Sequence, residues 1–106
     1  RRERDESGFF GAFCLHPQTH QATVEGRSVK LSQIEYRILS YLVHHPGVYL
    51  SGQQIYQALW GKDPLGDTRT VQVHIHNLRK KIEADPANPV YLKSGWGKGY
   101  YFNSGE

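Results

Sequence analysis

The chain lacks the features of secreted and membrane-spanning proteins. Cys14 is its only cysteine, so no disulfide can form within it, which favours a reducing compartment. No apolar run approaches the roughly 18 to 20 residues that a membrane helix needs, and no signal peptide opens the chain. We therefore expect a soluble, cytoplasmic protein with no membrane partner. Methionine is absent, even at position 1, which predicts that the sequence is a piece of a longer protein.

Signals of catalysis and of metal binding are missing as well. The sequence has no Gly-x-Ser-x-Gly elbow and no phosphate-binding loop, so we expect neither an enzyme nor a small-molecule substrate or cofactor. The candidate metal ligands do not have the paired spacing of a structural zinc site, so we expect no metal. These candidates are Cys14, His16 and His20, or His44, His45, His74 and His76.

Length and composition predict one small domain. The chain has 106 residues, of which 38% are hydrophobic and 12% aromatic, which is enough to fill one core. Residues 1–8 alternate in charge and carry no apolar side chain, which is typical of a linker. We predict a linker from a missing N-terminal domain over residues 1–8 and a folded domain over 9–106.

The charge is distributed unevenly along the chain. The net charge is +3, yet residues 1–6 and 7–68 each hold equal numbers of basic and acidic side chains. Residues 69–98 hold six basic and two acidic ones. This excess indicates a polyanionic partner such as nucleic acid, because clustered Lys and Arg release counterions from phosphates. A solvated basic face is the alternative that charge alone leaves open.

The apolar patterns predict strands followed by two helices. Short alternating pieces at 9–16, 21–25 and 28–31 predict a small meander of strands. Ser32 and Glu35 form a capping box, with Leu31 placed to pack on Tyr36, and the helix they begin should run to His45. A second capping box, Ser51 and Gln54, predicts a helix that ends near Trp60.

A third helix and a hairpin are predicted at the C-terminal end. Val71, Ile75, Leu78 and Ile82 form one apolar stripe of a helix from about Arg69 to Ala84, with Asp67 or Thr68 as its N-cap. Strands at 90–93 and 99–103 should be joined through a turn at 95–97, with Trp96 and Lys98 near its tip. Tyr36, Tyr41, Tyr56 and Trp60 suit either the core or an interface, and we favour the core.

The opposite face of the third helix has the chemistry of base recognition. Arginine suits guanine, amides suit adenine edges, a valine methyl suits thymine and lysines suit phosphates. Taken singly, each residue also fits an ordinary solvated position. The residues expected to contact DNA are Arg69, Thr70, Gln72, Val73, His76, Asn77, Arg79, Lys80, Lys81, Trp96 and Lys98.

Five motifs in this order and spacing resemble the OmpR/PhoB family of response-regulator effector domains, over residues 9–103. The motifs are Leu31-Ser32-x-x-Glu35-Tyr36-x-Ile38-Leu39, Pro46-Gly47-Val48-x-Leu50-Ser51, Leu59-Trp60-Gly61, Arg69-Thr70-Val71-x-Val73-His74-Ile75-x-x-Leu78-Arg79-Lys80-Lys81 and Gly97-x-Gly99-Tyr100-x-Phe102.

The resemblance implies an α+β fold, the winged helix-turn-helix. It implies a four-stranded N-terminal antiparallel sheet, a three-helix core and a C-terminal β-hairpin wing. The third helix would enter a major groove of double-stranded DNA, and the wing would reach a neighbouring minor groove. The loop between the second and third helices would face RNA polymerase. That loop comprises Lys62, Asp63, Pro64, Leu65, Gly66 and Asp67.

The resemblance also implies a role in transcription regulation. The domain would be the output half of a two-component response regulator, binding direct-repeat promoter sites as a homodimer when a receiver domain is phosphorylated. The alternatives are a one-component regulator fused to a sensory domain, or a module that acts mainly through contacts with RNA polymerase or with itself.

Three positions depart from the family pattern. Many members have an acidic residue at the position of Gln72, and many have arginine at the position of Trp96 in the wing. His76 and Asn77 stand where many relatives have arginine. The base preference of relatives therefore does not transfer to this chain.

Overall fold

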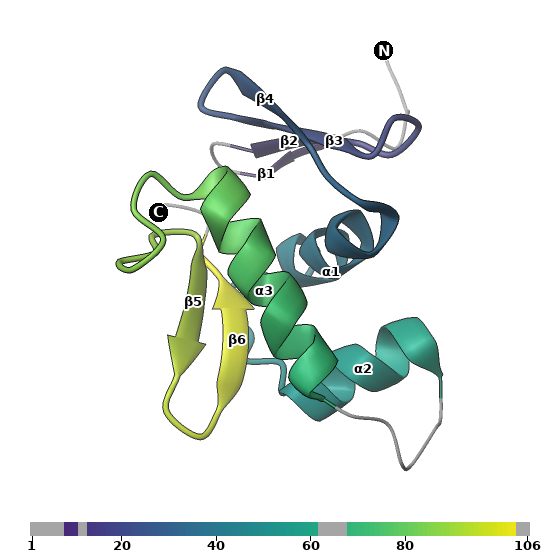
Figure 1. Cartoon of the computed structure of the whole chain (residues 1–106), viewed down its shortest axis with the longest axis vertical. Helices are drawn as coiled ribbons and strands as arrows, with labels where there is room; N and C mark the ends of the chain where they lie inside the picture. The colour runs from purple at the N-terminus through teal and green to yellow at the C-terminus, as the bar shows by residue number, and fades with distance from the viewer. Residues whose placement is uncertain (1–7, 11–12, 62–67, 104–106) are drawn as a thin grey trace.

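The chain folds into a four-stranded sheet, a group of helices and a separate hairpin (Figure 1). The computed structural model describes residues 8–10, 13–61 and 68–103. The N-terminal strands are β1 (Gly8–Phe10), β2 (Phe13–His16), β3 (Gln21–Val24) and β4 (Arg27–Lys30). They are followed by α1 (Gln33–Val43), α2 (Gly52–Trp60), α3 (Arg69–Ile82), β5 (Leu92–Gly95) and β6 (Gly99–Phe102). This arrangement confirms the predicted winged helix-turn-helix. No helix in these ranges is long and apolar enough to cross a membrane.

The N-terminal sheet is antiparallel in the order β1-β2-β3-β4. The piece predicted as one strand over 9–16 is two strands, because β1 and β2 pair side by side with Phe10 opposite Phe13. Alternate residues of β2 and β3 are buried, which places one face of the sheet against the core. Since β1 begins at Gly8, the predicted linker otherwise lies outside the described residues.

Both predicted capping boxes are confirmed. The Ser32 hydroxyl accepts a hydrogen bond from the Glu35 N–H at 3.1 Å, and the Glu35 carboxylate accepts one from the Ser32 N–H at 2.9 Å. Ser51 and Gln54 make the same reciprocal pair at 3.0 and 2.8 Å. Each box satisfies two N–H groups that a helix N-terminus leaves without partners.

The first helix ends at Val43, two residues before the predicted end at His45. The imidazole Nδ1 of His44 donates to the Ser40 carbonyl at 2.7 Å, and that of His45 donates to the Tyr41 carbonyl at 2.8 Å. The Ser40 carbonyl also accepts from the His44 backbone N–H at 3.1 Å, whereas the His45 backbone N–H turns to the Leu42 carbonyl at 3.0 Å. The His45 imidazole therefore occupies the Tyr41 carbonyl that a longer helix would bond through its backbone.

The ends of α3 also differ from the prediction. Of the two predicted N-cap residues, Thr68 stands at the N-cap position in αR geometry but makes no side-chain cap hydrogen bond. Asp67, the other alternative, lies outside the described residues. The helix ends at Ile82 rather than Ala84, because Glu83 is extended and its carboxylate bonds to the N–H groups before and within β5.

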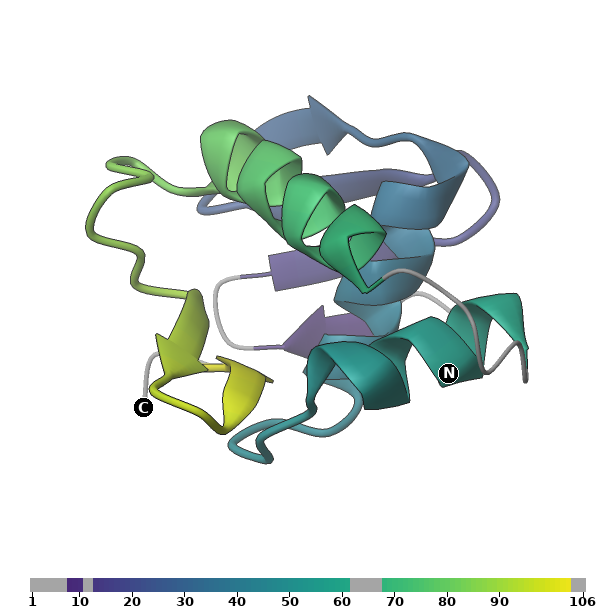
Figure 2. The same cartoon turned by 60° about the horizontal axis from the view of Figure 1, so that its bottom comes forward.

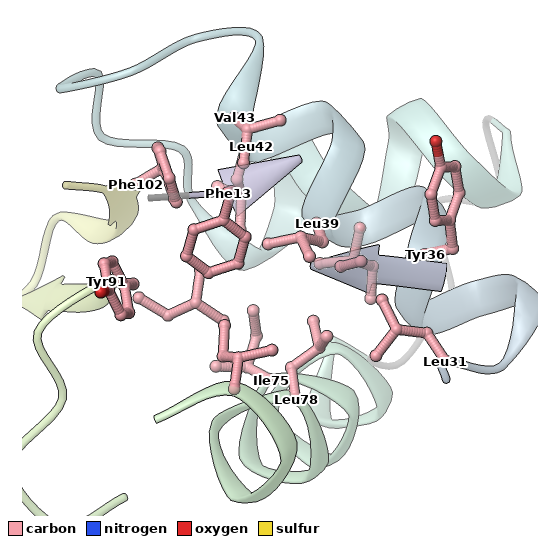
Figure 3. Close-up of a cluster of buried hydrophobic side chains, with 14 of the residues drawn as sticks. Phe13, Leu31, Tyr36, Leu39, Leu42, Val43, Ile75, Leu78, Tyr91 and Phe102 are labelled. Atoms are coloured by element: carbon pink, nitrogen blue, oxygen red, sulfur yellow. The ribbon is translucent and has the colours of Figure 1, made fainter. Parts of the chain in front are cut away.

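The core lies between the sheet, the helices and the hairpin (Figure 3). Phe13 of β2 meets Tyr91 and Phe102 edge to face, with ring centroids 4.8 and 5.2 Å apart. The predicted stripe of α3 is fully buried. Of the four aromatic residues in question, Tyr36 is buried, whereas Tyr41, Tyr56 and Trp60 are partly buried at the edge of this core.

The first strand of the hairpin, β5, begins at Leu92, two residues after the predicted start at residue 90. Its register pairs Leu92 with Phe102 and Gly95 with Gly99, so Trp96, Gly97 and Lys98 form the turn. The predicted strand over 90–93 is shifted because the backbone N–H groups of residues 90 and 91 donate to Glu83 instead. The hairpin joins the core through a β-bridge between Leu50 and Tyr100.

Candidate nucleic-acid interface

The helix α3 lies beside the hairpin (Figures 1 and 2). One side of α3 carries exposed residues along its whole length. Helical periodicity puts this side opposite the buried stripe. No acidic residue occurs anywhere in α3, and Val73 is 56% exposed. Thr70 and Asn77 are partly buried at the margins. The predicted residues that are exposed on this face are Arg69, Gln72, Val73, His76 and Lys80.

An open groove of about 750 Å³ separates α3 from the hairpin. Gln72 and Arg79 line it from α3, and Trp96 and Lys98 line it from the hairpin turn. Residues 51–53, at the start of α2, also line it. Two predicted contacts on the helix and two on the hairpin turn therefore border one groove.

The hairpin tip presents an aromatic ring and a cation. Trp96 is 100% exposed. The Lys98 ammonium lies 5.4 Å from the centre of the Tyr49 ring, and Tyr49 meets Tyr101 edge to face at 4.7 Å. The Tyr49 ring thus packs against the Lys98 side chain, whereas the Trp96 side chain is fully open to solvent.

Two of the predicted phosphate contacts are held by other parts of the fold. Arg79 Nε donates to the Leu92 carbonyl at 2.9 Å, and its guanidinium lies 5.9 Å from the centre of the Tyr100 ring. Lys81 Nζ donates to Glu35 Oε1 at 2.5 Å. The exposed cations of the predicted set are Arg69, Lys80 and Lys98.

The pair of Lys81 and Glu35 joins α3 to α1. Burial alone would raise the pKa of Glu35, but hydrogen bonds from Lys81 and Ser32, with the charge of Lys81, hold that pKa below its ordinary value of 4.5. A carboxyl group with a lowered pKa stabilises the fold above its unfolded pKa, and this contribution is lost as the pH falls through the folded pKa.

Replacement of Lys81 with methionine is expected to lower the free energy of unfolding by about 1 kcal/mol at neutral pH, because it removes one ion pair. The difference from wild type should shrink progressively as the pH falls below 4.5, because Glu35 then takes up a proton in both proteins. Urea denaturation at neutral and acidic pH measures this, with Lys80→Met, at an exposed position, as the control. A difference that stays constant with pH would contradict the assignment.

Sequence reasoning missed Glu83. Its side chain is only 5% exposed, and its carboxylate accepts backbone hydrogen bonds from Val90, Tyr91 and Leu92. No periodic pattern marks this residue, because its partners belong to an irregular segment and to the first residue of β5.

The remaining candidates have other surroundings. His74 is partly buried beside the stripe, as expected, and its ring stacks on Trp60 with centroids 6.1 Å apart. Among residues 8–10, 13–61 and 68–103, no three His, Cys, Asp or Glu side chains are grouped as metal ligands would be. The loop predicted to face RNA polymerase, residues 62–67, lies outside the described residues.

Comparison with known proteins relates the chain to bacterial regulators. A family model described as transcriptional regulatory protein, C terminal, matches residues 26–102. The chain is 39% identical over 106 residues to the uncharacterized transcriptional regulatory protein YrkP of Bacillus subtilis, covering 98% of this chain and 46% of YrkP. It is 43% identical over 90 residues to the sensory transduction protein RegX3 of Mycobacterium tuberculosis, covering 85% of this chain and 40% of RegX3. The chain thus spans less than half the length of these relatives.

Solved structures show the same fold. The Klebsiella pneumoniae RstA DNA-binding domain, crystallised in complex with the RstA box, superimposes with a TM-score of 0.82 at 29% identity, covering 94% of this chain and 99% of that one. The response regulator DrrB of Thermotoga maritima, an OmpR/PhoB homologue, gives a TM-score of 0.81 at 27% identity, covering 94% of this chain and 45% of DrrB.

Proposed function

We propose a function from the premise that this chain belongs to the family of transcriptional regulatory protein C-terminal domains, the effector domains of OmpR/PhoB type. The domain binds double-stranded DNA sequence-specifically and thereby regulates transcription. The observation that carries this proposal is the exposed, acid-free face of α3 beside the exposed hairpin tip. The complex of the related RstA domain with the RstA box supports it.

The proposed geometry assigns α3 to a major groove, which is about 12 Å wide and admits a helix. Arg69, Gln72 and Asn77 have side chains that hydrogen-bond base edges, and the exposed Val73 suits a thymine methyl group. Lys80 provides a phosphate contact at the rim of the same face. The hairpin then acts as the wing, with Trp96 and Lys98 at a neighbouring minor groove.

The longer protein would be a response regulator. The chain covers 46% and 40% of the two relatives described above, which leaves length for a phosphorylatable receiver domain ahead of a linker at residues 1–8. A receiver that dimerises on phosphorylation would place two of these domains on direct-repeat half-sites about one helical turn apart and raise their effective concentration. Residues 62–67 would contact RNA polymerase, and the protein would act in the cytoplasm.

Amide mapping tests this proposal. Titration of the isotope-labelled chain with a duplex of mixed sequence should shift the amide signals of the exposed face of α3 and of residues 94–99. The signals of β2 and β3, on the far side of the core, should stay unchanged. Shifts confined to other surfaces, or no binding at low salt, would contradict DNA binding by this face.

The two residues at the wing tip are expected to act differently. Lys98→Ala should reduce the slope of log affinity against log salt by about one unit, because one phosphate contact is removed. Trp96→Ala should weaken binding with little change in slope, because an indole displaces no counterion. Equal slopes for wild type and Lys98→Ala would show that Lys98 does not touch phosphate.

A further inference from the structure

We propose that Glu83 and Arg79 are positioning residues that fix the wing against α3, so that the wing tip meets DNA at a set distance from the recognition helix. This inference rests on the proposed function. It also changes the role expected for Arg79 from the sequence, where its position in a basic run indicated a phosphate contact.

Glu83 holds the chain where it enters the wing. One carboxylate oxygen accepts from the Val90 N–H at 2.7 Å, and the other accepts from the N–H groups of Tyr91 at 3.0 Å and Leu92 at 2.8 Å. These three donors lie within the acceptor capacity of the two carboxylate oxygens. Hydrogen bonds to a charged group are stronger than those between neutral groups, and this group is 5% exposed.

Arg79, four residues before Glu83, also bonds to the start of β5. Its Nε donates to the Leu92 carbonyl at 2.9 Å. Both backbone polar groups of Leu92, the first residue of β5, are therefore bound by side chains of α3 and its C-cap. The Arg79 guanidinium also lies 5.9 Å from the centre of the Tyr100 ring, so it contacts β6 as well. Arg79 lies in the last turn of α3, and Glu83 is the C-cap whose backbone N–H donates to the Arg79 carbonyl at 3.0 Å.

The wing needs such anchors because a two-stranded hairpin is at best marginally stable by itself. On its other side it is held by the bridge to Leu50, with bonds of 2.8 and 2.9 Å to Tyr100. That bridge, with the bond from the Gly47 N–H to the Phe102 carbonyl at 3.0 Å, fixes β6 to the segment before α2. The buried Leu92 and Phe102 pack the base of the wing into the core, and Arg79 and Glu83 add polar bonds between α3 and β5. Their loss should therefore loosen the wing relative to α3.

The first arm of the test needs no DNA. In Glu83→Gln, which keeps the shape but removes the charge and one acceptor, amide hydrogen exchange at residues 90–92 should accelerate about tenfold relative to Ile75 in the core of α3. Asp85→Asn is the matched control, because within the described part of the chain the Asp85 carboxylate bonds to Ala87 and Asn88 of its own turn. Unchanged exchange in Glu83→Gln would overturn the inference.

The second arm measures coupling to DNA binding, on a duplex enriched by the wild-type chain from a random library. Trp96→Ala should weaken wild-type binding about tenfold, the scale of one aromatic contact with nucleic acid. In the Glu83→Gln background the same substitution should have little effect, because the wing is no longer held in place. An undiminished effect of Trp96→Ala would overturn the inference, since a purely structural role lowers stability without changing this coupling.

Arg79→Lys separates positioning from a phosphate contact. Lysine keeps the cation but cannot reproduce the bond from Nε to Leu92. Positioning predicts that Arg79→Lys binds about as weakly as Glu83→Gln, with a salt slope lowered as in Lys98→Ala, because the loosened wing loses the phosphate contact of Lys98. Wild-type affinity in Arg79→Lys would overturn the role of Arg79. Failure of the proposed function can be distinguished from these outcomes. In that case the wild type itself would enrich no duplex, whereas the hydrogen-exchange experiment, which needs no DNA, would still report on the anchoring of the wing.

Discussion

Simultaneous replacement of Arg69, Asn77 and Lys80 with alanine is expected to abolish sequence-specific binding while the domain stays folded. None of the three belongs to the buried stripe of α3. Alanine has the highest helix propensity, so the helix itself should persist. Two lost base contacts at about 1 to 3 kcal/mol each, with one lost phosphate contact, predict at least a hundredfold weaker binding.

The measurement compares binding to the wild type's enriched duplex with thermal unfolding of the same protein. A control variant, Lys30→Ala with Gln33→Ala, removes an exposed cation and an exposed amide at the junction of β4 and α1. This control should bind like wild type. A triple variant that is folded and binds with unchanged affinity would contradict the assignment of α3 as the recognition helix.

Gly99→Ala is expected to be strongly destabilising. Gly99 has φ +108°, a region that side chains disfavour, and a Cβ there would lie 2.3 Å from the Leu50 carbonyl oxygen. That carbonyl belongs to the backbone bridge that attaches the wing, so it cannot move without breaking a hydrogen bond. We expect a loss of about 3 kcal/mol or more, a large part of the stability of a small domain.

Gly97→Ala is the matched control for this effect. Gly97 also has positive φ, +72°, but a Cβ there would meet nothing within 4 Å. Only the conformational term of about 1 kcal/mol should remain. Urea denaturation of both variants separates the cost of the steric clash from the cost of the backbone conformation. Equal losses in the free energy of unfolding at the two positions would show that the clash with Leu50 does not contribute.

Local patterns predicted the elements because their determinants are local. The capping boxes at Ser32 and Ser51 bond within one turn of chain, and the stripe of α3 follows from helical periodicity alone. The ends of elements were predicted less well, because tertiary bonds decide them. Glu83 ends α3 two residues early by bonding to residues seven to nine positions ahead.

The exposed face of the candidate site was predictable for the same reason, since the side opposite a buried stripe must face out. The sequence did not predict which basic side chains of this face are held by bonds within the fold. Lys81 pairs with Glu35, 46 residues earlier, and Arg79 bonds to Leu92, 13 residues later. No local spacing encodes such contacts, so a run of basic residues indicates a basic segment without distinguishing a DNA contact from a bond within the fold.

Selection of this domain on a library of random duplex DNA, with sequencing of the bound fraction at two salt concentrations, tests sequence-specific binding most directly. We predict enrichment of a short motif that persists at the higher salt concentration, because base contacts depend on salt less than phosphate contacts do. Enrichment of a direct repeat spaced by about one helical turn would also support binding as a pair. Binding without enrichment of any sequence would contradict the claim that the exposed face of α3 reads bases.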